Sequence, residues 1–127
     1  MSKWLIETVN LTKIYHIGDV DIVALEDVNF KLRKGEFVSI MGPSGSGKTT
    51  LLHLISGLDR PTYGKVFFNG ENITELSESE LAKFRCRNIG FVFQFYNLIP
   101  ILTALENVEL PTIAAGIPRD EGHRRAL

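Results

Sequence analysis

The segment Gly42 to Thr49, which reads Gly-Pro-Ser-Gly-Ser-Gly-Lys-Thr, has the residue types and spacing of a phosphate-binding P-loop. Its glycines let the backbone curl so that successive N–H groups point into one concavity, which suits an anion. Lys48 can reach the β- and γ-phosphates of a nucleotide, and the Thr49 hydroxyl is placed to ligate Mg²⁺. The motif therefore predicts a nucleoside triphosphate site.

The segments on either side of the loop support this interpretation. Residues 36–41 are mostly apolar and predict a buried strand that leads into the loop. A helix is expected from about Lys48 to near Gly57, so the phosphates would lie at its N-terminus. Thr50, in its first turn, is a further candidate phosphate contact. An ordinary glycine-rich turn with a solvent lysine is the alternative, which these flanks disfavour.

Composition excludes several other classes of protein. The chain has 127 residues, of which 44% are hydrophobic, and a net charge of −1, which gives no electrostatic case for a nucleic-acid partner. One cysteine excludes an internal disulfide and a cysteine-rich zinc site, and the three histidines lack metal-ligand spacing. The N-terminus lacks a secretory pattern, and no run approaches the roughly 18 apolar residues of a membrane helix. Any work at a membrane would therefore need a partner.

The pattern of apolar residues, turn signals and capping boxes in the rest of the chain predicts further strands and helices. Strands are expected at residues 22–25, 28–33, 65–68 and 89–93. Asn69-Gly70 is a type I′ hairpin signal. Capping boxes at Ser77–Glu80 and Thr103–Glu106 should each open a helix. We expect Pro111 to end the second of these helices and a last helix to begin near Gly122. Together these elements predict an α/β fold.

Three features outside the loop narrow the family. Tyr15 ends the strand-like Leu-Thr-Lys-Ile-Tyr, a hairpin covers residues 69–73, and Phe-Val-Phe-Gln ends at Gln94 before Glu-Asn-Val-Glu-Leu-Pro at residues 106–111. With the P-loop, these features resemble the nucleotide-binding domain of an ABC transporter. Within that family, the sequence is most similar to the ATP-binding subunits of the lipoprotein-release and macrolide-export type. The resemblance spans essentially all 127 residues, but only about half of the family's domain.

The resemblance implies a fold and a set of site residues. It implies a P-loop NTPase core with an antiparallel N-terminal sheet, in which residues 1–94 form the ATP-binding core and residues 95–127 start a helical subdomain. Tyr15 would stack on adenine, although a tyrosine packed at a sheet edge is the alternative. Gln94 would contact Mg²⁺ and the attacking water, and would act with Lys48 in catalysis. The implied nucleotide-binding set is Tyr15, Gly42, Pro43, Ser44, Gly45, Ser46, Gly47, Lys48, Thr49 and Thr50.

A dense apolar stretch, residues 95–102, follows Gln94. By resemblance, Tyr96 and Leu98 to Leu102 would receive a membrane-spanning transporter subunit, which would hold the chain on the inner face of the cell membrane. The alternative is that these side chains pack the root of the helical subdomain. The same exposed surface and an unpaired sheet edge predict a homodimer.

The family also has parts that do not follow Gln94 here: a strand ending in Asp-Glu, a Leu-Ser-Gly-Gly-Gln signature and a late histidine. We therefore expect a truncated domain that anchors nucleotide but turns over little ATP alone. A non-hydrolysing nucleotide-binding or interaction module remains the alternative. A small-molecule kinase or a GTPase would leave the Gln94 segment unexplained, and no Asn-Lys-x-Asp guanine-reading segment is present.

Overall fold

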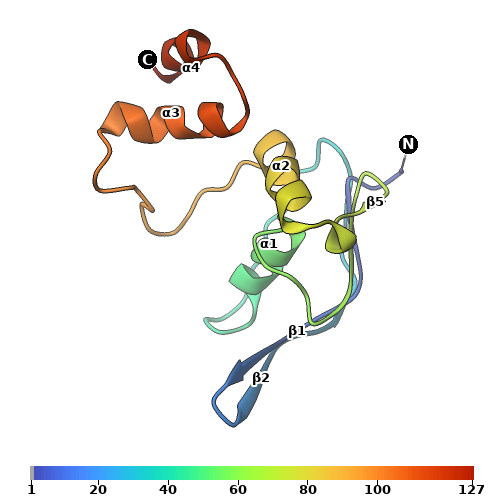
Figure 1. The fold of residues 1–127 in the computed structure, drawn as a ribbon. Helices are drawn as coiled ribbons and strands as arrows, with labels where there is room; N and C mark the ends of the chain where they lie inside the picture. The colour runs from blue at the N-terminus through green and yellow to red at the C-terminus, as the bar shows by residue number, and fades with distance from the viewer. Residues whose placement is uncertain (1) are drawn as a thin grey trace. The chain divides into compact units, whose positions relative to one another are not determined.

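The structure is a computed structural model that describes residues 2–127 and divides into two compact units, one ending at Leu81 and the other running from Ala82 to Leu127. The elements, in chain order, are β1 (Ile6–Ile17), β2 (Val20–Val28), β3 (Lys31–Leu32), α1 (Lys48–Ile55), β4 (Tyr63–Phe68), β5 (Glu71–Asn72), the 3₁₀ helix η1 (Ile73–Glu75), α2 (Glu78–Asn88), α3 (Ala104–Ala114) and α4 (Arg119–Ala126) (Figure 1). The boundary between the units falls within α2.

An antiparallel sheet with the order β2-β1-β4-β5 forms the first unit, and β3 pairs with the start of β1. β1 is rich in the β-branched and aromatic residues that favour strands, and it pairs with three neighbours. Its N-terminal half is buried at Ile6, Thr8 and Leu11. The Thr8 hydroxyl donates to Val28 O and accepts from the Phe30 N–H, so this polar group is satisfied inside the sheet. The predicted antiparallel N-terminal sheet is confirmed.

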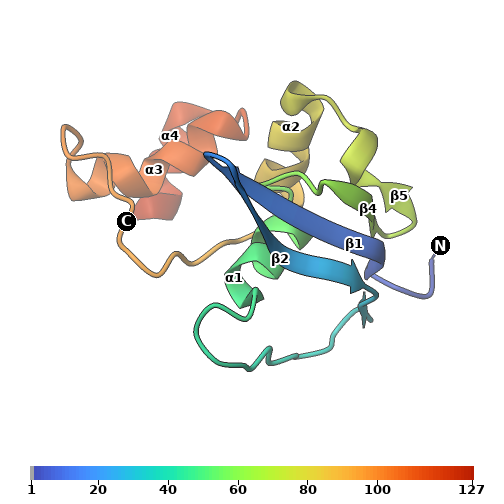
Figure 2. The same ribbon diagram turned by 90° about the horizontal axis from the view of Figure 1, so that it is seen from below.

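Helix α1 packs against β1 and β2 through the buried side chains of Leu51 and Leu54. In Figure 2 the hairpin formed by β1 and β2 crosses over α1. The helix ends where the sequence predicts. Gly57 takes φ +73°, its N–H donates to Leu54 O, and the Leu58 N–H donates to His53 O. These bonds form a Schellman motif, which satisfies the last carbonyls of the helix.

Two predicted strands are wrong. Residues 36–41 and 89–93 have no regular secondary structure, and Phe37 and Val92 are 98% and 96% exposed. A strand is stabilised by ladder hydrogen bonds and by burial against neighbouring elements. Within residues 2–127 neither segment pairs with a strand, so neither is stabilised by ladder hydrogen bonds or by burial in a sheet. The predicted strand at residues 28–33 is also shorter, because only Lys31–Leu32 pair as β3.

The second unit contains α3 and α4. Thr103 caps α3 in the predicted capping box with Glu106, and the Ser77–Glu80 box at the start of α2 is likewise confirmed. Pro111, however, lies inside α3 and does not end it. The helix instead ends at Gly116 (φ +71°), where the Gly116 N–H donates to Ile113 O and the Ile117 N–H donates to Thr112 O. α4 begins at Arg119, before the predicted start near Gly122.

Candidate functional site

The backbone of residues 42–47 forms a tight turn that leads directly into α1. Gly45 and Gly47 take φ +80° and +92°, in the left-handed region that favours glycine. The Ser46 N–H donates to Pro43 O at 3.2 Å, and the Leu51 N–H donates to Gly47 O at 2.9 Å, which closes the first turn of α1. The glycine spacing therefore gives the loop its curvature and lets the helix begin at Lys48.

Two glycines of the loop lie close to neighbouring atoms, but only Gly47 faces a backbone atom that cannot move aside. A Cβ on Gly47 would stand 2.5 Å from Ala24 O on β2, and a Cβ on Gly42 would stand 2.7 Å from Ser46 Oγ. Gly47 thus sets the close approach between the loop and the β1–β2 hairpin. A Cβ on Gly42 would meet the side chains of Ser46 and Lys48 on the same loop.

The Lys48 ammonium bends back over the loop. Its Nζ donates to Gly42 O and Pro43 O, both at 2.7 Å, and to Ser46 Oγ at 3.3 Å. The side chain therefore places positive charge over the turn that it follows. Ser44 and Thr49 are exposed, while Thr50 is half-buried. The cation, the exposed hydroxyls and the open glycine backbone together fit a phosphate group with a hard cation beside it.

Tyr15 lies on β1 and pairs with Ile22 of β2, two residues before the Ala24 carbonyl that approaches Gly47. One hairpin therefore carries Tyr15 and contacts the loop. The Tyr15 hydroxyl donates to Asp59 Oδ2 at 3.4 Å, a long contact, and Lys13 Nζ lies over the ring at 5.1 Å from its centroid.

No sequence motif joins Lys13 to Asp59, because the two residues lie 46 positions apart. Lys13 Nζ contacts both carboxylate oxygens of Asp59, at 3.0 and 3.1 Å. Partial burial raises the pKa of Asp59, but the hydrogen bonds from Lys13, the Arg60 N–H and Tyr15, with the charge of Lys13, outweigh it and hold the pKa below its ordinary value. The carboxylate is therefore ionised beside Tyr15 at neutral pH.

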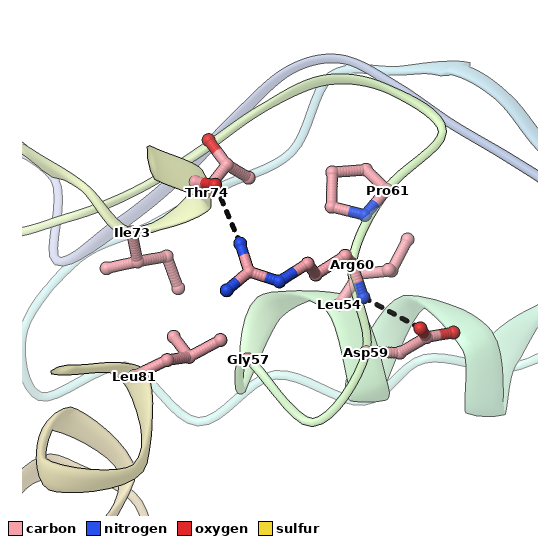
Figure 3. A pocket seen from close by; sticks show the side chains of 8 residues that line it. All are labelled: Leu54, Gly57, Asp59, Arg60, Pro61, Ile73, Thr74 and Leu81. Atoms are coloured by element: carbon pink, nitrogen blue, oxygen red, sulfur yellow. Dashed lines mark hydrogen bonds between the residues drawn. The ribbon is translucent and has the colours of Figure 1, made fainter. Parts of the chain in front are cut away.

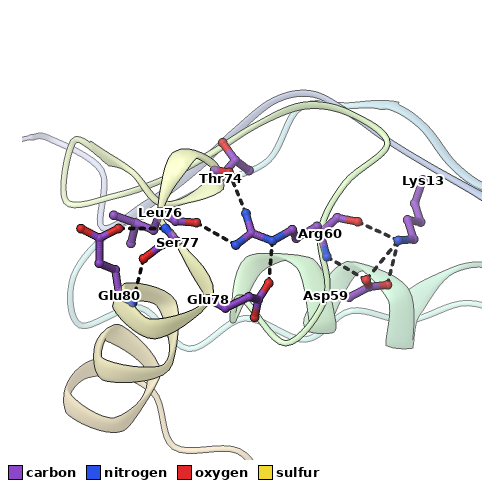
Figure 4. Close-up of polar contacts among 8 residues, drawn as sticks. All are labelled: Lys13, Asp59, Arg60, Thr74, Leu76, Ser77, Glu78 and Glu80. Carbon is purple, nitrogen blue, oxygen red and sulfur yellow. Dashed lines mark hydrogen bonds and ion pairs between the residues drawn. The ribbon is translucent and has the colours of Figure 1, made fainter.

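Arg60 follows Asp59 in the loop after α1, and its side chain points away from Lys13 (Figure 4). Its guanidinium donates to Glu78 Oε1 at 2.9 Å, to Thr74 O at 3.1 Å and to Leu76 O at 2.7 Å. The side chain borders a cavity of about 10 Å³ with Leu54, Ile73 and Leu81 among its lining residues (Figure 3). A space of about one water molecule is a packing gap and not a nucleotide site. Arg60 therefore ties the loop after α1 to η1 and the start of α2.

Gln94 belongs to the second unit and is exposed in an irregular segment. The predicted partner stretch follows it. Tyr96 and Ile101 are largely exposed, whereas Leu102 is half-buried. Asn107, which belongs to the family motif at residues 106–111, holds this stretch: the Ile99 N–H donates to its Oδ1, and its Nδ2 donates to Ile99 O, Leu102 O and Thr103 O. The stretch thus combines half-buried side chains with largely exposed ones.

A second cavity in the described part of the chain is too small to be a ligand pocket. A cavity of about 210 Å³ lies between α3 and α4, bordered by Glu106, Glu109, Arg119 and His123, and it is smaller than the roughly 300–1,000 Å³ of ligand pockets. Across residues 2–127, the acidic, histidine and cysteine side chains form no group that could hold a metal ion by themselves. In the same described range, no helix has the length and apolarity needed to cross a bilayer.

The glycine-rich sequence of a P-loop therefore forms a tight turn that opens α1, and α1 packs on the antiparallel β1–β2 hairpin. The chain belongs to the ABC transporter family, since that family's model matches residues 25–126. The resemblance predicted from the motifs is confirmed, and with it the α/β P-loop fold.

The similar proteins within this family are ATP-binding proteins. The chain is 56% identical over 124 residues to an uncharacterized ABC transporter ATP-binding protein of Thermotoga maritima, covering 98% of this chain and 53% of the relative. It is 46% identical over 117 residues to the lipoprotein-releasing system ATP-binding protein LolD of Geobacter metallireducens, covering 92% and 52%. A Methanocaldococcus jannaschii ATP-binding cassette, solved as a dimer in a post-hydrolysis state with ADP and Pi, superposes with a TM-score of 0.88 at 50% identity, covering 95% and 53%. The chain spans about half the length of these relatives.

Proposed function

We propose that this chain binds Mg·ATP through residues 42–49 and is the nucleotide-anchoring part of an ABC transporter ATP-binding subunit. The observation that carries the proposal is the loop itself, in which the Lys48 ammonium lies over a left-handed glycine turn at the start of α1. The loop combines backbone N–H groups, an ammonium group and a helix N-terminus, and all three favour the binding of a polyphosphate. The solved cassette that contains ADP and Pi gives further support.

Each residue of the proposed site has a distinct task. Backbone N–H groups from Gly42 to Gly47 bind phosphate oxygens, with the hydroxyls of Ser44 and Ser46 beside them. Lys48 neutralises the β- and γ-phosphates, and Thr50 adds a hydroxyl in the first turn of α1. Thr49 and, as the family resemblance implies, Gln94 would hold Mg²⁺, which would neutralise charge on the phosphates. Tyr15 stacks on adenine, and Gln94 also orients the attacking water. We propose the division at residue 94 on the same basis, with residues 95–127 starting a helical subdomain.

The proposed partner is a membrane-spanning transporter subunit that receives the stretch around Tyr96 and Leu98 to Leu102. The exposed Tyr96 and Ile101 side chains support this surface, because exposed apolar patches mark interaction sites. In the whole protein, two copies would act together at the inner face of the cell membrane. ATP binding and hydrolysis there would drive export or lipoprotein release by the separate membrane subunit, as the likeness to LolD suggests.

Calorimetric titration with Mg·ATP tests the phosphate site. We expect Lys48→Ala to weaken binding at least about tenfold, because a charge-assisted contact to phosphate is worth about 1.5–3 kcal/mol. Lys83→Ala, which removes an exposed lysine of α2, is the matched control and should bind as the unmodified protein does. Equal affinity in Lys48→Ala and the control would overturn the proposed phosphate site.

A second candidate is a nucleotide-binding or interaction module that does not hydrolyse ATP. The exposed, irregular setting of Gln94 favours it, because a residue that orients water must itself be held in place. A steady-state phosphate-release assay tests this second candidate, which predicts no turnover at all. Turnover that disappears in Gln94→Ala would exclude the second candidate.

A further inference from the structure

We propose that Lys13 and Asp59 are positioning residues that fix the Tyr15 ring so that one face is presented to a purine base. The inference rests on the proposed function, in which Tyr15 stacks on adenine, and it adds two residues that act through Tyr15. Neither residue belongs to the loop at residues 42–49.

The first step is the way β1 places Lys13 beside Tyr15. Residues two apart on a strand share one face, so the Lys13 side chain runs alongside the Tyr15 ring. Its Nζ lies over that ring, 5.1 Å from the centroid. A cation over one face is attracted by the ring, and it occupies the side on which a base would otherwise stack. The base must therefore approach from the opposite face.

The second step is what holds Lys13 in place. Its ammonium contacts both carboxylate oxygens of Asp59, at 3.0 and 3.1 Å, and donates to Arg60 O at 2.7 Å. The Lys13 side chain is only 14% exposed, so the cation is partly desolvated and its contacts are stronger than those of a surface lysine. The carboxylate is itself fixed by the Arg60 N–H, which donates to Asp59 Oδ1 at 2.7 Å.

The third step joins the ring to the same carboxylate. The Tyr15 hydroxyl donates to Asp59 Oδ2 at 3.4 Å, so Asp59 contacts the edge of the ring directly and contacts one of its faces through Lys13. A ring that is already oriented loses less rotational freedom when a base stacks on it. The loss of Lys13 or Asp59 should therefore weaken binding of the base and leave binding of the phosphates unchanged.

Calorimetry with two ligands tests this division, because Mg·ATP carries a base and Mg·tripolyphosphate does not. We expect Tyr15→Ala to weaken Mg·ATP binding about 5- to 100-fold, the range of one base–aromatic stack. Lys13→Met keeps the side-chain length and should weaken Mg·ATP binding about 3- to 10-fold, while Mg·tripolyphosphate binding stays within about twofold. Lys13→Arg restores the cation and should recover most of the loss for Mg·ATP.

The double variant Lys13→Met/Tyr15→Ala separates positioning from a purely structural ion pair. If Lys13 acts through Tyr15, adding Lys13→Met to Tyr15→Ala should have no further effect on Mg·ATP binding. An undiminished Lys13→Met effect in that background would overturn the inference, and so would equal weakening of both ligands. Tyr15→Phe, which removes only the hydroxyl, keeps the test available if Lys13→Met does not fold: it should weaken Mg·ATP alone, and an unchanged affinity would count against the role of Asp59.

Failure of the inference can be told from failure of the proposed function. If Lys48→Ala binds both ligands normally, the phosphate site itself is wrong. If Lys48→Ala weakens both ligands but Tyr15→Ala leaves Mg·ATP unaffected, the phosphate site stands, while the stacking role and the positioning of Tyr15 both fall.

Discussion

Gly47 and Ala24 approach each other so closely that a Cβ on Gly47 would stand 2.5 Å from the Ala24 carbonyl oxygen. The same Cβ would stand 2.9 Å from Leu25 Cδ2, in the buried part of β2. The last glycine of the loop therefore does two things: it supplies a left-handed backbone and it lets α1 dock on the hairpin that carries Tyr15. A substitution there should be felt well beyond the loop.

We predict that Gly47→Ala lowers the free energy of unfolding by at least about 2–3 kcal/mol. The left-handed φ of +92° accounts for about 1–2 kcal/mol, and the close approach to Ala24 O adds the rest. Gly45→Ala is the matched control, since Gly45 has φ +80° and no atom within 4 Å of the added Cβ. It should cost only about 1–2 kcal/mol. Urea unfolding measures both, and equal losses would contradict the docking role of Gly47.

A second prediction concerns the tether made by Arg60. Arg60→Met removes the donors to Thr74 O, Leu76 O and Glu78 but keeps much of the aliphatic stem. We expect a loss of about 2 kcal/mol in the free energy of unfolding, because two partly buried carbonyls lose a charged donor. Glu78→Gln removes only the exposed ion pair and should change stability by less than about 0.5 kcal/mol. Comparable losses in the two variants would assign the tether to the ion pair instead.

A third prediction follows from the lowered pKa of Asp59. A carboxyl group whose pKa is lower in the folded state than in the unfolded state stabilises the fold above its unfolded pKa. That contribution is lost as the pH falls from about 4 through the folded pKa. Asp59→Asn cannot titrate, so its stability should fall less steeply in this range.

Urea unfolding of both proteins between pH 6 and pH 3 makes this comparison. The carboxyl groups of Glu106 and Glu121 also have lowered pKa values, but they are present in both proteins and cancel in the difference. Parallel stability curves for the two proteins would contradict a stabilising role for ionised Asp59.

A fourth prediction is that the chain self-associates without nucleotide. The apolar side chains of Phe37, Met41, Val92, Phe95 and Tyr96 are largely exposed, and exposed apolar segments of this kind invite association with another chain. Light scattering coupled to size exclusion, with and without Mg·ATP, should detect a dimer in both conditions. A monomer at tens of micromolar, or a dimer that forms only with Mg·ATP, would refute association through these segments.

The elements that the sequence predicts correctly are those decided by a few neighbouring residues. Gly57 ends α1, Asn69-Gly70 turns β4 into β5 with φ +49° and +87°, and Thr103 caps α3. The loop at residues 42–49 belongs to this group, because its glycines and its following helix are contiguous. Such signals need no knowledge of distant parts of the chain.

The errors arise where distant residues decide. The apolar run at residues 36–41 has the composition of a strand, but pairing requires a neighbour that no nearby residue supplies. In α3, Gly116 and not Pro111 terminates the helix, because a proline removes one donor whereas a left-handed glycine closes the helix. The contact between Lys13 and Asp59 joins β1 to a loop 46 residues away, and no local pattern announces it.

Asp59 and Arg60 are adjacent, yet one contacts Lys13 and Tyr15 while the other contacts η1 and the start of α2. The spacing between these two side chains and the end of α1 is therefore fixed by two sets of neighbours at once. Inserting or deleting one residue between Gly57 and Asp59 would turn both side chains away from their partners together. The two sets of contacts therefore constrain the length of this connection as well as the side chains that it carries.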